Sequence, residues 1–494
     1  MADVRCILAL DQGTSSTKGV LFGLDSVVRG VASVPVDLHS PAAGWVQQDP
    51  EQIFQSALAA AKTLLTDNAE AEVVGLAITN QRESALAWDP ETGQPLSAML
   101  GWQDRRTAKR LADFTDAQRE QIRQITGLPL DPMFSALKFA WILDQIDPDR
   151  SLAKAGRVAL GTVDSWLVYR LTCEHVIEVG NASRTQLLSL ETGDWSPELL
   201  ELFNIPAIAL PAVVGSDHQT EVCAEGPLKG LPILGVLADS HAALFAHYAT
   251  NGTAVKATFG TGSSVMALST LPAKADSGLV STVAWGTEGH VVHAVEGNIL
   301  SSGSTAVWLG ALLDKSAGEL ADLARLKLPV GISGGNVNIV PAFGGLGAPW
   351  WDINATALIE GMTLDTDAGD LAVAVFEAIC LQVSDVLAAV ESVTKQNVSV
   401  ANLDGGPTAN RWLMQLMANL SQRRVSVSAI AELSAVGVAV FAARSAGLAS
   451  ELNLAANSEY LPVVEPSAAK ARKTNWDSAV ARARYNPISP VQPN

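Results

Sequence analysis

The sequence predicts an α/β protein built from two similar halves, and three observations support this prediction. The chain has 494 residues, which is too long for one ordinary core, and 48% of them are hydrophobic, so two well-buried domains are expected. The stretch Ile7–Gly23, ILALDQGTSSTKGVLFG, has the pattern of strand, tight turn and strand. The stretch Lys256–Ser269 repeats this pattern, and Gly260 lies 247 positions after Gly13, half the length of the chain. We therefore expect one domain over residues 1–248 and a second over residues 249–494.

The turn of the first hairpin carries groups that suit an anion. Gly13 lets the backbone come close to a ligand, and the turn amides are joined by hydroxyls and a lysine that would cradle a phosphate: Thr14, Ser15, Ser16 and Lys18. Asp11 ends a buried strand and would serve as a partner of Mg²⁺, which binds few carboxylates and keeps its waters. The alternative is that these residues only close a hairpin. The second copy favours a duplicated fold clamped around one nucleotide.

Composition excludes several classes of function. The net charge of −18 argues against nucleic acid and anionic membrane as partners, although a local cradle can still hold a nucleotide. The start of the chain lacks the regions of a signal peptide, and no run of roughly 18 apolar residues predicts a transmembrane helix. The cysteines lack CxxC spacing, which predicts buried free thiols in a reducing cytosol and no metal site: Cys6, Cys173, Cys223 and Cys380.

In chain order, the first half continues with a strand over residues 31–37 and a helix that begins at Pro50, with Asp49 as its N-cap. A buried strand follows from Val73, and its polar end carries Arg82 and Glu83. In a cleft, these two side chains offer the donor fork and the acceptor that a vicinal diol requires. As a surface ion pair they would contribute little.

The first half carries two further places with candidate site residues, and between them a candidate helix cap. Trp102 would present a flat apolar face to the CH groups of a polyol, although packing in the core is as probable. Within residues 158–172, Asp164 is placed to N-cap an amphipathic helix, because it precedes residues with apolar spacing. An apolar strand from Leu231 ends at Asp239 and Ser240, where a carboxylate faces the crevice beyond the strand ends and would act as a general base, or would merely cap the helix that follows.

The second half contains a loop rich in Gly and Pro over residues 336–363 and then a long apolar helix from Asp370 to about Val393, expected to be buried. Residues 402–420 have the pattern of strand, Gly-Gly turn and helix. Gly406 lets a nucleobase or ribose lie against bare backbone, and Asn410 would hydrogen-bond it. After about Pro462 the chain turns polar and basic and ends in a proline-rich tail, expected to be partly mobile.

Taken together, these motifs resemble the FGGY family of carbohydrate kinases, and within it most resemble the glycerol kinase branch. The likeness covers nearly the whole chain in order: LDQGTSSTK, GWVQQDP, ITNQRE, WQDRRTA, TGLPLDPMFSALKFAWILD, GTVDSWL, NASRT, ADSHAAL, FGTGS, VPAFGGLGAPWWD and LDGGPTAN. The resemblance implies an α/β, actin-like (ribonuclease H-like) duplicated fold of two domains, each built on a five-stranded sheet, that close over MgATP and substrate in an interdomain cleft. It also implies a cytoplasmic homo-oligomer, a dimer or a tetramer.

The resemblance further assigns roles to residues. Asp11 would meet Mg²⁺, Asp239 would take the proton from the attacking hydroxyl, and Arg82, Glu83 and Trp102 would hold the polyol. The nucleotide would be bound by residues of both halves: Thr14, Ser15, Ser16, Lys18, Thr261, Gly303, Gly406 and Asn410. ATP and Mg²⁺ are thus the implied cofactors, and the implied reaction converts ATP and glycerol or a related polyol into ADP and the polyol phosphate.

Departures from the family pattern concern the acceptor. Glycerol kinases carry Tyr where this chain has Met133 and Gln where it has Ser240, so the pocket should be roomier and less polar at these points, and a larger polyol or ketose of four or five carbons is a serious alternative. Val307 also replaces a Gln on the nucleotide side, and the basic Gly-rich loop that binds fructose 1,6-bisphosphate in some bacterial glycerol kinases is not found after Cys223. Two other classes stay open, namely a non-catalytic actin-like nucleotide-binding protein and a plain ATPase on the same scaffold.

Overall fold

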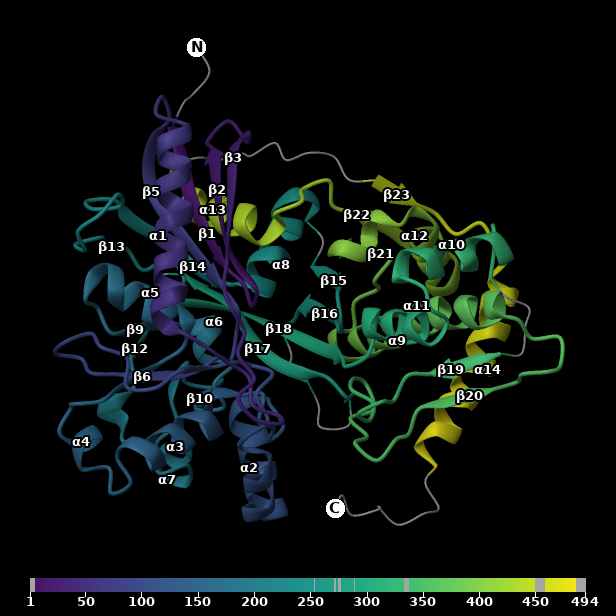
Figure 1. The fold of residues 1–494 in the computed structure, drawn as a ribbon, viewed down its shortest axis with the longest axis horizontal. Helices are drawn as coiled ribbons and strands as arrows, with labels where there is room; N and C mark the ends of the chain where they lie inside the picture. The colour runs from purple at the N-terminus through teal and green to yellow at the C-terminus, as the bar shows by residue number, and fades with distance from the viewer. Residues whose placement is uncertain are drawn as a thin grey trace. The chain divides into compact units, whose positions relative to one another are not determined.

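The fold is described from a computed structural model, which covers residues 5–252, 254–270, 272–273, 277–287, 289–332, 337–448 and 458–485 (Figure 1). The chain divides into two compact units. The first comprises Met1–Gly252, Ser281–Ala294 and Ile430–Leu454, and the second comprises Thr253–Val280, Val295–Ala429 and Ala455–Asn494. The sequence analysis placed a single boundary after residue 248, whereas two later segments belong with the first unit.

A six-stranded sheet, and not the five-stranded sheet that was expected, forms the centre of the first unit, in the order β13-β14-β5-β1-β2-β3. The expected first hairpin is present, with β1 and β2 antiparallel and Gln12 paired with Thr17 beside the turn. β5 is parallel to both β1 and β14, so the carboxyl ends of these three strands meet at one edge, whereas β13 pairs antiparallel with β14. The bounds are β1 Arg5–Gln12, β2 Ser16–Gly23, β3 Val28–Pro35, β5 Glu72–Asn80, β13 Thr220–Glu221 and β14 Pro232–Ala238.

Helices pack against this sheet and explain why a late segment joins the first unit. α1 (Pro50–Asp67) begins as predicted, with the side chain of Asp49 accepting from Glu51 N, and packs on β2 and β3. α13 (Leu433–Ser445) packs on α8 (Asp239–Asn251), β1 and β14. A Cβ at Gly437 would lie 2.0 Å from the carbonyl oxygen of Ala242, so only glycine permits this approach of α13 to α8.

The remaining elements of the first unit lie outside this sheet. They are β4 Gln47–Gln48, β6 Leu86–Trp88, β7 Met99–Leu100, α2 Asp116–Thr126, α3 Ser135–Ile146, α4 Ser151–Lys154, β8 Ala159–Gly161, α5 Val163–Thr172, β9 Val176–Glu178, α6 Val179–Ala182, β10 Leu188–Ser189, β11 Asp194–Trp195, α7 Pro197–Leu202, β12 Ala212–Val214 and β17 Val280–Thr287.

The second unit contains the repeated hairpin, which the structure confirms as β15 and β16, antiparallel with Phe259 paired with Ser263. β15 and β16 belong to a seven-stranded sheet in the order β17-β18-β16-β15-β21-β22-β23. The elements are β15 Val255–Phe259, β16 Ser263–Leu268, β18 His290–Ile299, α9 Gly303–Leu312, α10 Ala317–Lys327, β19 Asn338–Val340, β20 Leu358–Glu360, α11 Ala368–Thr394, β21 Val400–Asp404, α12 Arg411–Ser421, β22 Arg424–Val427, β23 Ser458–Tyr460 and α14 Pro466–Arg484.

The predicted long helix is α11, and it forms the centre of the second hydrophobic core. It has 27 residues and is apolar enough to cross a bilayer by length and composition, yet its most hydrophobic stretch is 89% buried inside the protein. Its two faces meet α10 and α12 as well as strands, and this burial on several sides accounts for its lack of a polar face.

Three expectations differ from the structure, and a fourth falls outside the described residues. Asp164 does not cap α5, because the cap is Thr162 and Asp164 lies in the first turn, where it accepts from the amide of Glu178. Asp239 is the first residue of α8 and not its N-cap, which is Ala238. The polar segment after Pro462 forms α14, with Trp476 fully buried, whereas the proline-rich tail from residue 486 lies outside the described residues. Cys173 and Cys223 are exposed, and only Cys6 and Cys380 are buried.

Candidate functional site

Two carboxylates stand at the edge of the first sheet where parallel strands end. Asp11 pairs in register with Thr79 on β5, and Asp239 directly follows Ala238, which pairs with Asn80 on the same strand. Burial and the nearby charge of Asp239 raise the pKa of Asp11 to about 7, and the ammonium of Lys18 partly opposes this shift. The edge is therefore an acidic site that would favour a bound cation.

Arg82 lies between the catalytic candidate Asp239 and Glu83. Its Nε is 3.6 Å from Oδ1 of Asp239 and 3.9 Å from Oε1 of Glu83. The Asp239 side chain is 37% exposed, whereas those of Arg82 and Glu83 are 10% and 6% exposed. Asp239 is thus open to a small ligand at a point where a buried guanidinium holds its orientation, and the structure brings these predicted residues together.

Glu83 is held from three sides in an unusual backbone conformation. Its φ is 63°, in the left-handed region that residues other than glycine rarely adopt. Its carbonyl oxygen accepts from Ser135 Oγ at 3.0 Å and from Lys138 Nζ at 3.0 Å, and its carboxylate accepts from Arg184 Nε at 2.7 Å. These contacts fix both ends of a residue that the sequence analysis assigned to the acceptor.

Lys138 connects Glu83 to the position where the chain departs from the glycerol kinase pattern. Besides the Glu83 carbonyl, its Nζ donates to the carbonyl of Met133 at 2.6 Å, and the side chain is fully buried. Burial lowers the pKa of Lys138 to about 7, although Glu83 and two nearby aspartates oppose the shift. A neutral amine has two N–H donors, which matches the two carbonyls. Sequence reasoning assigned no role to this lysine.

The turn of the first hairpin is held by buried glutamines that sequence reasoning also missed. Gln81 Nε2 donates to Gln12 Oε1 at 3.0 Å and to Gln48 Oε1 at 2.9 Å. Gln48 Nε2 in turn donates to the carbonyl of Thr14 at 2.8 Å, and Gln12 Nε2 donates to that of Gly13 at 2.7 Å. The sequence did contain a signal for this network, namely one glutamine in each of the strand-end motifs LDQGT, WVQQD and NQRE.

The other predicted residues of the hairpin lie as follows. Trp102 is 37% exposed, and its Nε1 donates to Oγ1 of Thr14 at 3.0 Å, so it is not a core residue. The carbonyls of Ser15 and Ser16 accept from the amides of Val36 and Gly13, both at 2.9 Å, which closes the turn. Lys18 Nζ donates to Glu432 Oε2 at 2.7 Å, so its ammonium points to the start of α13 in this structure.

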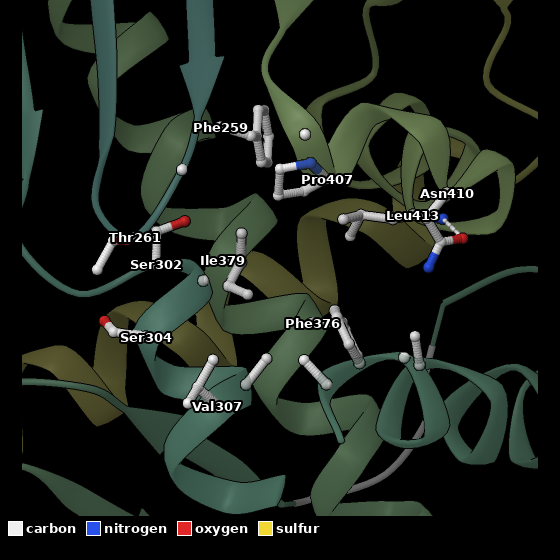
Figure 2. Close-up of a pocket in the computed structure, with 17 residues that line it drawn as sticks. Phe259, Thr261, Ser302, Ser304, Val307, Phe376, Ile379, Pro407, Asn410 and Leu413 are labelled. Carbon is white, nitrogen blue, oxygen red and sulfur yellow. Dashed lines mark hydrogen bonds between the residues drawn. The ribbon is translucent and has the colours of Figure 1, made fainter. Parts of the chain in front are cut away.

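The second unit has a cavity of about 750 Å³ that collects every nucleotide-binding residue predicted in that half (Figure 2). Thr261, Gly303, Gly406 and Asn410 all line it. Its walls are mainly apolar and come from β15, α9, α10, α11 and α12, among them Phe259, Val307, Phe376, Ile379 and Leu413. Such a volume accommodates a nucleotide, and the apolar walls suit the faces of a base.

Two glycines shape the wall of the cavity through their lack of a side chain. A Cβ at Gly303 would lie 2.5 Å from the carbonyl oxygen of Gly260, so the start of α9 can sit there only without a side chain. Gly406 meets nothing within 4 Å at its Cβ position and leaves that wall bare. Asn410 caps α12 by accepting from Leu413 N at 3.2 Å through Oδ1, which leaves its amide nitrogen as a donor near the cavity. The first turn of α9 also offers amides to a phosphate.

No cluster of three or more His, Cys, Asp or Glu side chains that could hold a metal occurs within the described ranges. The acidic pair Asp11 and Asp239 nevertheless fits Mg²⁺, which takes one or two carboxylates and completes its shell with phosphate oxygens and waters. A cation there would also relieve the repulsion that raises the pKa of Asp11.

Comparison with known proteins agrees with this arrangement. The N-terminal domain of the FGGY family of carbohydrate kinases matches residues 6–246, and the C-terminal domain of that family matches residues 255–446. A glycerol kinase of Alkalilimnicola ehrlichii is 38% identical over 494 residues, 97% of this chain and 98% of the relative. An apulose kinase of Pectobacterium atrosepticum is 37% identical over 493 residues, 97% of this chain and 99% of the relative.

Solved structures show the same architecture. The crystal structure of Plasmodium falciparum glycerol kinase with ADP has a TM-score of 0.89 to this chain at 26% identity, and the likeness covers 98% of this chain and 99% of that one. The duplicated, actin-like α/β fold predicted from the sequence is confirmed by this likeness.

Proposed function

The chain belongs to the FGGY family of carbohydrate kinases and is an ATP-dependent sugar or polyol kinase, and we propose that it phosphorylates a hydroxyl of glycerol or of a related small polyol or ketose. One observation carries the proposal. Asp239 is an accessible carboxylate 3.6 Å from the buried Arg82, at the strand edge that also carries Asp11.

In this proposal, Asp239 accepts the proton of the attacking hydroxyl, since an aspartate beside an arginine is ionised at neutral pH. Arg82 donates to acceptor hydroxyls, Glu83 accepts from them, and Trp102 packs against the carbon chain. Phosphoryl transfer requires little of the protein beyond positioning and neutralising charge, which agrees with a site of one base and many donors.

The nucleotide is assigned to the cavity of the second unit, with the base against the apolar wall and Asn410 as a donor. Its phosphates are assigned to Thr261 and the first turn of α9. The hairpin residues Thr14–Ser16 of the first unit are proposed, on their own chemistry, as groups that bind a phosphate. Mg²⁺ would be held at Asp11 and would neutralise charge on the phosphates. The ion pair of Lys18 with Glu432 implies that Lys18 must change partner before it can bind a phosphate.

For the acceptor there are two candidates, and Met133 and Ser240 favour the second. Glycerol is the first, because two relatives that are 38% and 39% identical over nearly the whole chain are glycerol kinases. A polyol or ketose of four or five carbons is the second, because a thioether and a short hydroxyl at these positions leave more room and fewer polar contacts. The apulose kinase relative, 37% identical over nearly the whole chain, supports a sugar acceptor.

The test is an ADP-release assay with MgATP against glycerol, erythritol, threitol, the pentitols, the common ketopentoses and apulose. Acceptor-dependent ADP release identifies the kinase, and the highest kcat/KM identifies the acceptor. Release at the same rate without any acceptor would indicate a plain ATPase, and no release would indicate a nucleotide-binding protein without transfer. Asp239→Asn is the control for activity from contaminants.

The proposal also places the protein in the cytosol as a homo-oligomer, a dimer or a tetramer. Light scattering after size-exclusion chromatography measures the mass of the assembly. A mass equal to that of one chain at the concentration of the assay would contradict this part of the proposal.

A further inference from the structure

Two exposed cysteines face each other on the first unit, away from the residues assigned to the reaction. Cys173 follows α5 as its C-cap, and Cys223 follows β13, fifty positions later in the chain. Their sulfur atoms are 3.9 Å apart, and both residues are exposed. The other two cysteines, Cys6 and Cys380, are buried.

The backbone around the pair is held in register by several contacts. The carbonyl of Leu171 accepts from the amides of Cys223 and Ala224, both at 3.0 Å, so the segment after β13 is attached to the last turn of α5. Next to Cys173, the carboxylate of Glu174 accepts from Thr220 Oγ1 at 2.7 Å and bonds His218 Nε2 at 3.0 Å. The two thiols therefore stay close without a covalent bond.

We propose that Cys173 and Cys223 are a site of reversible thiol–disulfide exchange, at which a low-molecular-weight disulfide such as oxidised glutathione converts the pair into an intramolecular disulfide. One cysteine thiolate attacks the oxidant, one glutathione thiolate leaves, and a mixed disulfide forms. The second cysteine thiolate attacks the protein sulfur of that mixed disulfide and releases the second glutathione. Two cysteine thiols and one oxidised glutathione thus become one protein disulfide and two reduced glutathiones.

The second step is the one that the structure favours. A thiol already 3.9 Å away reacts as an intramolecular partner, with a far higher effective concentration than free glutathione. Partial desolvation of the exposed Cys173 thiol and its hydrogen bond with Cys223 raise the pKa of Cys173, so the exchange proceeds faster at alkaline pH, where the thiolate forms. Burial also raises the pKa of Cys380, which adds to its protection from the oxidant.

The disulfide would fasten a turn that leads to the catalytic candidate. Residues 222–231 form a closed loop in which Val222 N donates to Leu231 O at 3.0 Å and Gly230 N donates to Val222 O at 2.9 Å. β14 follows this loop and ends beside Asp239. Oxidation would therefore restrain the loop against α5 without touching the residues assigned to the acceptor.

The full-length native protein is treated with oxidised glutathione, blocked with an alkylating reagent and mapped by mass spectrometry after proteolysis. We expect a linked pair of peptides that contain Cys173 and Cys223, while Cys6 and Cys380 are alkylated only after denaturation. In Cys173→Ser and in Cys223→Ser, the remaining cysteine should stop at the mixed disulfide. Accumulation of mixed disulfides in the parent protein, or a link between two chains, would overturn the proposal.

Hydrogen exchange tests the restraint on the loop. Amides of residues 222–231 should exchange more slowly after oxidation and recover after reduction with dithiothreitol, and the same treatment should leave Cys173→Ser unchanged. If these amides of the parent protein exchange at the same rate before and after oxidation, the disulfide does not restrain the loop, and this part of the proposal is wrong. Because the readout is covalent and does not depend on phosphoryl transfer, its failure is distinguishable from failure of the proposed kinase reaction.

Discussion

Replacement of Lys138 by methionine should weaken acceptor binding while leaving the fold nearly as stable. Lys138 Nζ is fully buried and donates to the carbonyls of Glu83 and Met133. Methionine fills a similar volume but donates no hydrogen bond. The Glu83 carbonyl keeps its bond from Ser135, so the Met133 carbonyl is the group that loses its partner.

The magnitude follows from two opposing effects. A partly buried carbonyl left without a donor costs about 1–3 kcal/mol. Against this, the pKa of Lys138 is lowered from 10.5 to about 7, so at pH 8 the folded chain holds the amine neutral whereas the unfolded chain protonates it. That difference costs the parent protein about 3 kcal/mol, which methionine avoids. We expect the variant to stay within about 2 kcal/mol of the parent in its free energy of unfolding.

The sign of the pH dependence provides an independent check. Between about pH 7 and 10.5 the unfolded chain binds one more proton at Lys138 than the folded chain does, so this group makes the parent more stable as pH rises. The stability of Lys138→Met lacks this contribution. The difference in unfolding free energy, parent minus variant, should therefore grow from pH 7 to pH 10.

Steady-state kinetics give the decisive measurement. If the lost bond loosens the acceptor pocket by about 1–3 kcal/mol, KM for the preferred acceptor rises about fivefold to a hundredfold, while KM for ATP changes little. Lys62→Met, an exposed position on α1, is the matched control. An unchanged acceptor KM in a folded variant, or equal increases in both KM values, would refute the assigned role of Lys138. A parent protein without acceptor-dependent activity would refute the proposed function itself.

Three further predictions concern the same unit. Asp239→Asn should bind MgATP nearly as the parent does, measured by calorimetry, and lose a factor on the order of 10² or more in turnover through loss of the general base; equal turnover would remove Asp239 from the mechanism. Met133→Tyr combined with Ser240→Gln should shift the ratio of kcat/KM toward glycerol, and an unchanged acceptor profile would mean that the pocket is misplaced. Burial of Glu178 raises the pKa of its carboxyl from 4.5 to about 7. Between these two pH values the folded chain binds more protons than the unfolded chain, so the contribution of Glu178 to the free energy of unfolding falls as pH rises. Glu178→Gln should flatten the decline in unfolding free energy from pH 5 to pH 8, measured by urea denaturation, and the same decline in the variant as in the parent would contradict the assignment.

Local patterns in the sequence predicted the elements well. The hairpin at Ile7–Gly23 and its repeat follow from alternating apolar residues interrupted by glycine, and the cap at Asp49 follows from its side chain and the proline after it. The position of Asp239 at a strand end followed in the same way. These features depend on neighbours within a few residues, which a single sequence displays directly.

Features that depend on distant partners were not predictable. Glu83 adopts its left-handed backbone because side chains 52 and 55 positions away hold its carbonyl and Arg184, 101 positions away, holds its carboxylate. The prediction at Asp164 failed because α5 begins at Val163, with Thr162 as its N-cap, so Asp164 lies inside the first turn, where its carboxylate accepts from the amide of Glu178. The exposed positions of Cys173 and Cys223 likewise result from the docking of two segments.

The way in which Lys138 holds the site also explains how acceptor preference can change without loss of the fold. Lys138 binds the main-chain carbonyls of Glu83 and Met133 and makes no demand on the side chain at position 133. A tyrosine or a methionine there would leave the same two hydrogen bonds in place, so the backbone of the pocket is fixed independently of the group that meets the acceptor. At position 133, the main-chain carbonyl thus fixes the backbone of the pocket, whereas the side chain determines which acceptor is preferred. For this reason Met133→Tyr should alter the acceptor profile with little change in stability, whereas Lys138→Met should weaken every acceptor alike.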